Sequence, residues 1–152
     1  MEIKRILFPT DFSEGSDSAP PYAADMAKHY GAKLYLLHVT QDVAKAVGWY
    51  VPHISMDELY REIETQAKKE MERYGIEELR GFKDIERTII KGVPYHEIIK
   101  FAGENKIDLI VMGTHGRKGL DRVIFGSTAE RVVRDAPCTG LSVRLPLHQT
   151  KK

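Results

Sequence analysis

A glycine-rich segment offers the clearest chemistry in this sequence of 152 residues. Its frame is G-x2-G-x9-G-S, at Gly113, Gly116, Gly126 and Ser127. The apolar run at 109–112 precedes the first glycine and is typical of a strand buried on both faces. Ser127 and Glu130 form a capping-box pattern, which predicts that a helix begins there. Because glycine loops and helix N-termini present free backbone N–H groups, this segment predicts an anion site that suits phosphate.

Two other phosphate loops do not fit this segment. A Walker A loop requires Gly-Lys-Ser/Thr after a four-residue gap, and a dinucleotide fingerprint requires G-x-G-x-x-G after the first strand. Gly113 and Gly116 could instead permit a tight turn, and Ser127 could merely cap a helix. Arg117 and its neighbour Lys118 form the basic pair of this loop, and a phosphate contact and plain solvation are equally open to them. The complete frame after a buried strand favours phosphate binding.

A second group of candidates follows the predicted strands. Pro9, Thr10 and Asp11 end the first strand, Val39 ends the second and Met112 ends the fourth. In open parallel sheets, ligands bind beyond the carboxyl ends of the strands, where the strand order reverses. The apolar members could flank a planar base, and Asp11 could accept hydrogen bonds from a sugar or base, or bind a metal. The alternative for Asp11 is a cap ahead of the first helix.

Strands and helices alternate along the chain and must position these residues. Strands are expected at 3–8, 33–39, 85–90, 107–112 and 139–144, with the third at a sheet edge. Helices are expected from about 18 to 30, from 55 to 74, from 94 and from 127. This pattern predicts an α/β fold, a single-domain, open five-stranded parallel sheet, doubly wound, spanning 1–146 with a polar tail at 147–152. Residues 40–53 are expected to form a long loop.

Helical periodicity also predicts which side chains the helices bury. The first helix, with prolines in its first turn and Gly31 as its stop, is expected to bury one apolar face. That face comprises Tyr22, Ala23, Met26, Ala27 and Tyr30. The helix from Ser127 is expected to bury Ala129, Val132 and Val133.

Composition excludes several classes of protein. The net charge is +1, from 23 Lys and Arg against 22 Asp and Glu, so no nucleic-acid or membrane surface is expected. No apolar run is long enough for a transmembrane helix, and the start does not resemble a signal peptide. One cysteine, Cys138, rules out an intramolecular disulfide. A cytoplasmic protein is the expectation.

Three further stretches, taken with the glycine frame, resemble the universal stress protein family. They are Ile-Leu-Phe-Pro-Thr-Asp-Phe-Ser at 6–13, Leu-Leu-His-Val at 36–39 and Gly-Val-Pro at 92–94. The frame at 113–128 matches the nucleotide-binding signature of the ATP-binding branch, and the resemblance covers nearly the whole chain. It implies a Rossmann-like fold of the adenine nucleotide alpha hydrolase-like kind, usually a homodimer. It also implies bound ATP, AMP or ADP, often with Mg²⁺ or Mn²⁺ on the phosphates.

The same resemblance implies a role for each matching residue. The adenine and ribose would be surrounded by Pro9, Thr10, Asp11, Val39 and Met112. Gly113 and Gly116 would approach the ribose and phosphates, and Thr114 and Arg117 are also expected to bind the nucleotide. Gly126, Ser127 and Thr128 would bind the phosphates. One departure from the family lies in the fifth strand, where Gly140 and Ser142 weaken the apolar seam that usually pairs across the dimer axis.

The sequence supports a catalytic function less well than nucleotide binding. The segment 13–18 approximates the pyrophosphate loop of ATP pyrophosphatases, but Glu14 places a negative charge where pyrophosphate would sit. His115 could act as a base, although no carboxylate partner is evident in the sequence. His38 fills a strand end, and Cys138 is expected to be a buried structural thiol. We therefore expect an ATP-binding module that signals stress or energy state through its partners. The alternatives are a slow ATPase or nucleotidyl-transfer enzyme using the same pocket, and a dimerising protein without a ligand.

Overall fold

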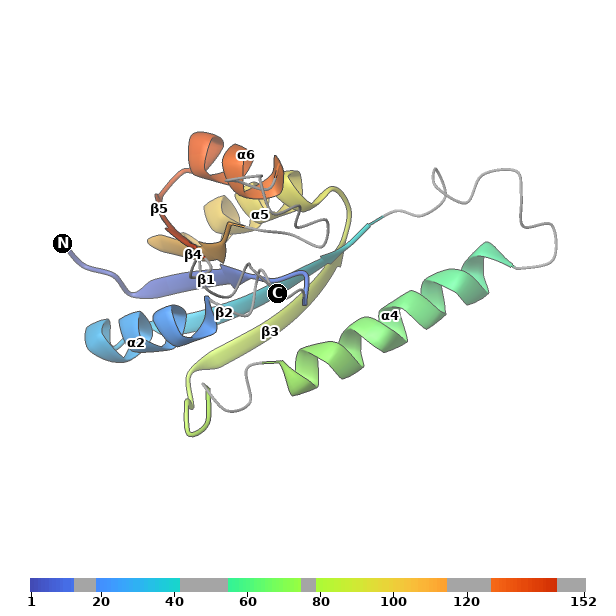
Figure 1. Ribbon diagram of the computed structural model, residues 1–152, viewed down its shortest axis with the longest axis horizontal. Helices are drawn as coiled ribbons and strands as arrows, with labels where there is room; N and C mark the ends of the chain where they lie inside the picture. Colours follow the sequence, from blue (N-terminus) through green and yellow to red (C-terminus); the bar gives the residue numbers. More distant parts are fainter. Residues whose placement is uncertain (13–18, 42–54, 75–78, 115–126, 145–152) are drawn as a thin grey trace, which may run out of the picture.

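Five parallel strands form one sheet in the computed structural model of this chain, which describes residues 1–12, 19–41, 55–74, 79–114 and 127–144. The order across the sheet is β3-β2-β1-β4-β5, and each neighbouring pair is parallel (Figure 1). The strands are β1 (Arg5–Pro9), β2 (Lys33–Thr40), β3 (Ile85–Lys91), β4 (Leu109–Gly113) and β5 (Thr139–Val143). The predicted parallel sheet is confirmed, and β3 lies at an edge as expected.

Helices cover both faces of this sheet, which confirms the doubly wound arrangement. On one face lie α2 (Pro20–Tyr30) and α4 (Met56–Arg73), packed on strand residues such as Ile6 and Leu36. On the other lie α5 (Pro94–Glu104) and α6 (Ser127–Asp135), packed on residues such as Leu7 and Ile110. Because side chains alternate along a strand, neighbouring residues of β1 feed the two separate cores. Within the described residues, none of the helices is long and apolar enough to cross a membrane.

Helix α2 begins and ends where its local chemistry predicts, but its buried face is not the expected one. Prolines occupy its first turn, and Gly31 ends it in the left-handed conformation, with φ +61°. Ala23, Ala24 and Ala27 are buried, whereas Tyr22 is 55% exposed and Tyr30 is 39% exposed. The prediction that the two tyrosines face the core is therefore wrong. The small alanine side chains let the helix axis approach the sheet closely, and the aromatic rings are left on the flanks.

Helix α6 spans Ser127–Asp135 and buries Ala129 and Val132, as predicted. The prediction for Val133 is wrong, because this side chain is 47% exposed. Val133 points about 100° away from Val132 around the helix axis, and in α6 it is Val132 that meets the core. Two other sequence predictions, the loop at 40–53 beyond residue 41 and the tail at 147–152, lie outside the described residues.

Candidate functional site

The strand order reverses beside β1. From β1 the chain proceeds to β2 and β3 on one side, and later to β4 and β5 on the other. The switch point therefore lies between the carboxyl ends of β1 and β4, which is where ligands bind in open α/β sheets. Thr10 and Asp11 follow β1 at this edge, and Gly113 ends β4 there. The sheet thus brings together residues that lie about a hundred positions apart in the sequence.

An apolar wall accompanies this edge. Val39 and Met112 are both buried, 8% and 6% exposed, and both belong to the core on the α5 and α6 face. Pro9 is also buried at the end of β1. Because Val39 and Met112 point to the same face of the sheet, they can line one surface against a flat ring. The arrangement suits a planar apolar group with polar contacts on its rim.

The turn that carries Asp11 is held by hydrogen bonds to β2. The Thr10 N–H donates to the Leu37 carbonyl oxygen at 2.9 Å, and the Thr10 carbonyl oxygen accepts from His38 Nδ1 at 2.8 Å. The Phe12 N–H donates to Thr10 Oγ1 at 3.0 Å. Phe12 adopts φ +63°, a left-handed conformation that costs an L-residue about 1–2 kcal/mol. Asp11 itself is half-buried between these two residues.

On the β4 side of the switch point, Thr114 contributes its backbone and its hydroxyl group. Thr114 is 3% exposed, and its N–H donates to the Val143 carbonyl oxygen at 3.1 Å, which ties the end of β4 to β5. Ser127 is exposed at the start of α6 and Thr128 is half-buried in its first turn. The other predicted members, Gly116, Arg117 and Gly126, lie outside the described residues, as does His115.

One cation near the first turns of α6 was missed by sequence reasoning. The Arg131 guanidinium carbon lies 4.5 Å above the centroid of the Tyr95 ring on α5. Arg131 follows Ser127 by about one turn of α6. Its position four residues after Ser127 is the signal that could have identified it, because that spacing places both residues on one helix face. The helix end and this guanidinium both favour a negative ligand group.

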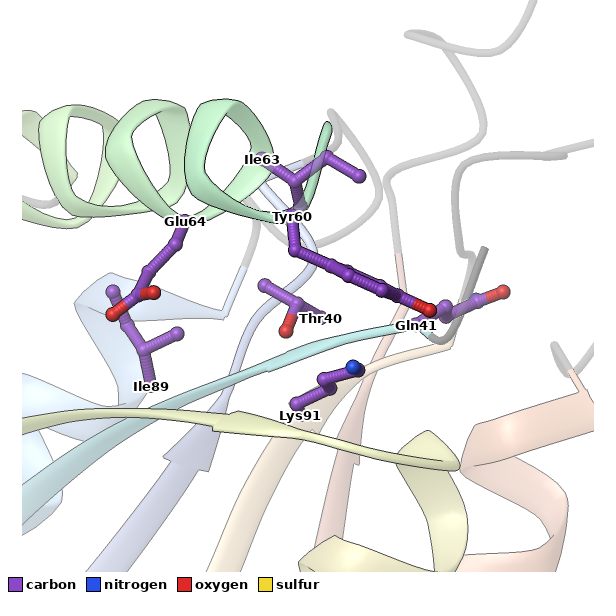
Figure 2. A pocket seen from close by; sticks show the side chains of 7 residues that line it. All are labelled: Thr40, Gln41, Tyr60, Ile63, Glu64, Ile89 and Lys91. Carbon is purple, nitrogen blue, oxygen red and sulfur yellow. The ribbon is translucent and has the colours of Figure 1, made fainter. Parts of the chain in front are cut away.

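A small pocket lies at the same edge of the sheet, but on the α4 face. Figure 2 shows Tyr60 over Lys91, with the Nζ of Lys91 lying 3.4 Å from the ring centroid. The cavity of about 190 Å³ is lined by Thr40, Gln41, Tyr60, Ile63, Glu64, Ile89 and Lys91. Ligand pockets commonly measure about 300–1,000 Å³, so this one suits a few waters or a small group. It borders β2 and β3, on the face opposite Val39 and Met112, and is therefore distinct from the switch point.

Catalytic and metal-binding features are sparse among the described residues. No group of three or more His, Cys, Asp or Glu side chains that could hold a metal ion occurs among them. Burial, and secondarily the negative charge of Asp108, raises the pKa of the Cys138 thiol. Cys138 is half-buried rather than buried as expected. A thiol with a raised pKa is a poor nucleophile at neutral pH.

Known proteins resemble this chain along nearly its full length. The sequence model of the Universal stress protein family matches residues 2–144. Universal stress protein MJ0531 of Methanocaldococcus jannaschii is 38% identical over 149 residues, which cover 94% of this chain and 83% of that protein. Universal stress protein UspA from Lactobacillus plantarum has a solved structure with 30% identity and a TM-score of 0.79, covering 95% of this chain and 99% of that one. A universal stress protein solved in complex with cAMP shares 25% identity, with a TM-score of 0.60 over 96% of this chain and 100% of that one.

Proposed function

This chain belongs to the universal stress protein family, and we propose that it is an adenine-nucleotide-binding module with ATP, AMP or ADP at the carboxyl edge of its sheet. The observation that carries the proposal is the convergence at the β1/β4 switch point. A buried apolar wall, the Asp11 turn and the end of β4 meet where doubly wound sheets bind ligands. The relative solved with cAMP supports an adenine ligand.

In this proposal each part of the nucleotide meets a different element. The adenine lies against Pro9, Val39 and Met112, and the ribose lies near Thr10 and Asp11. The ribose and phosphates continue along the loop that follows β4, through Gly113, Thr114, Gly116 and Arg117. The phosphates end at Gly126, Ser127 and Thr128, where the α6 N-terminus supplies N–H donors and a partial positive charge.

A divalent ion would be held mainly by the phosphates rather than by a protein cage. Mg²⁺ is usually bound through one or two carboxylates and the substrate phosphates, and it keeps several waters. Among the described residues, Asp11 follows β1 at this edge and could supply such a carboxylate. Mg²⁺ or Mn²⁺ bound with ATP would neutralise phosphate charge and strengthen binding at a helix N-terminus.

We infer that binding, rather than turnover, is the function. Backbone donors and an apolar base wall supply affinity without a group that activates water. The nucleotide state would then be read by partner proteins in the cytoplasm, or across a homodimer, as a stress or energy signal. Hydrolysis of excess ATP by the purified protein tests the alternative, because sustained turnover that is lost on Asp11→Ala or His115→Ala would make this chain an ATPase.

The phosphate assignment is tested by Gly126→Val, with Gly103→Val as the matched control. A valine at 126 places a branched side chain where the phosphates approach, so calorimetry with Mg²⁺ and ATP should show no binding while the fold survives. Gly103 lies in α5, where an added Cβ meets no atom within 4 Å, so its variant should bind ATP as the wild type does. Unchanged ATP affinity in Gly126→Val would contradict the phosphate assignment.

A further inference from the structure

His38 contacts the residues on both sides of Asp11. Its Nδ1 lies 2.8 Å from the Thr10 carbonyl oxygen, and its ring centroid lies 4.3 Å from that of Phe12, at an interplanar angle of 31°. A carbonyl oxygen can only accept, so His38 Nδ1 carries the proton and donates it. One buried side chain of β2, 7% exposed, therefore holds the residue before Asp11 and the residue after it.

The turn between these contacts is not one that its sequence favours. Phe12 and Lys106 are the two non-glycine residues with positive φ among the described residues, and Phe12 is the bulky one. An aromatic residue at φ +63° persists only where surrounding structure imposes that conformation. Such strained residues gather at binding sites, and this one lies directly after Asp11, which follows β1 at the switch point.

Three contacts impose the conformation. The Phe12 N–H donates to Thr10 Oγ1 at 3.0 Å, which closes the turn locally. The Phe12 ring packs between His38 and Tyr74, with ring centroids 5.6 Å apart in the edge-on contact to Tyr74. His38 reaches both the backbone before Asp11 and the ring after it.

We propose that His38 is a positioning residue that holds the Thr10–Phe12 turn in its strained form and thereby aims Asp11 at the ligand edge. The effect of His38 on ligand binding rests on the proposed nucleotide function, whereas the geometry of the turn does not depend on it. His38 does not touch the ligand in this scheme. It acts through Asp11, so its removal weakens binding only as far as Asp11 contributes.

Two substitutions separate the functions of the imidazole. His38→Phe keeps a ring against Phe12 and removes the donor to Thr10. His38→Asn loses the ring, but places an amide N–H at the same number of bonds from the backbone as Nδ1. Loss of one such hydrogen bond typically costs a factor of about two to ten in an equilibrium, so His38→Phe should raise the Kd for ATP by roughly fivefold. His38→Asn should recover part of that loss.

A double-mutant cycle with Asp11→Asn tests whether His38 acts through Asp11. In the Asp11→Asn background, His38→Phe should change the Kd by less than about twofold. His29→Phe, on the exposed face of α2, is the control and should leave the Kd unchanged. An equal effect of His38→Phe with and without Asp11 would overturn the proposal, and so would an unchanged Kd in the single variant.

NMR of the nucleotide-free protein measures the backbone conformation of the Thr10–Phe12 turn. A positive φ brings the amide and Hα protons of a residue close together, so Phe12 should show a strong intra-residue NOE in the wild type. That NOE should weaken in His38→Phe and not in His29→Phe, while urea unfolding verifies that both variants are folded. If the wild type binds no adenine nucleotide, the proposed function fails, and a weakened NOE still supports the role of His38 in holding the Thr10–Phe12 turn. An unchanged Phe12 NOE in His38→Phe overturns that role whatever the nucleotide result.

Discussion

Val132 connects the helix that carries Ser127 to the core of the sheet. Its side chain is 1% exposed and packs in the cluster that contains Ile110 and Met112. Val132→Ala removes two methyl carbons, which is about 1.6 kcal/mol of transfer free energy at ~0.8 kcal/mol per buried carbon. A cavity term adds to this, and the better helix propensity of alanine offsets about 0.5 kcal/mol. The expected loss of unfolding free energy is about 2 kcal/mol, or a fall of ~4–8 °C in Tm for a domain of this size.

Val133→Ala is the matched control on the next residue. Val133 is 47% exposed, so its truncation should change the unfolding free energy by less than about 0.5 kcal/mol. Urea unfolding followed by circular dichroism measures both variants against the wild type. Equal losses in the two variants would refute the orientation of α6, and with it the direction in which Ser127 and Thr128 are presented.

Two further predictions concern other parts of the fold. Gly31 ends α2 at φ +61°, so Gly31→Ala should lower the unfolding free energy by about 1–2 kcal/mol. Gly103→Ala within α5 should instead raise the unfolding free energy by about 0.5–1 kcal/mol. Urea unfolding of both variants tests whether the two changes in unfolding free energy have opposite signs. Burial and the charge of Asp108 raise the pKa of Cys138, so less thiolate is present in the folded protein, and iodoacetamide at pH 8 should react more slowly with it than with the urea-unfolded chain. Asp108→Asn should lower that pKa and shift the alkylation profile toward lower pH, and equal rates in the folded and unfolded protein would contradict this environment for the thiol.

Much of the fold could be predicted because its signals are local. Prolines in the first turn of α2 and Gly31 at its end fix the bounds of a helix without reference to the rest of the chain. Alternation of strands with helices then predicts a parallel sheet. The buried faces of the helices were harder to predict from the sequence. Hydrophobicity alone placed Tyr22 in the core, whereas close packing on the sheet buries the alanines instead.

The site could be predicted only where strand ends mark it. Thr10, Val39 and Met112 could be placed at the carboxyl edge because parallel strands share that edge. The contact of His38 with Phe12 joins two elements that are distant in the sequence, and no propensity places a phenylalanine in the left-handed region. Tertiary packing determines that conformation, so it becomes visible only in the folded chain.

Titration of the wild-type chain with ATP tests the central claim most directly. Calorimetry with Mg²⁺ present should show saturable binding of one adenine nucleotide per chain. At about a hundred times the Kd, the nucleotide should add ~2.7 kcal/mol to the unfolding free energy and raise Tm by roughly 5–10 °C. Absence of heat and an unchanged Tm with ATP, ADP and AMP at millimolar concentration would contradict the assignment of this edge of the sheet as a nucleotide site.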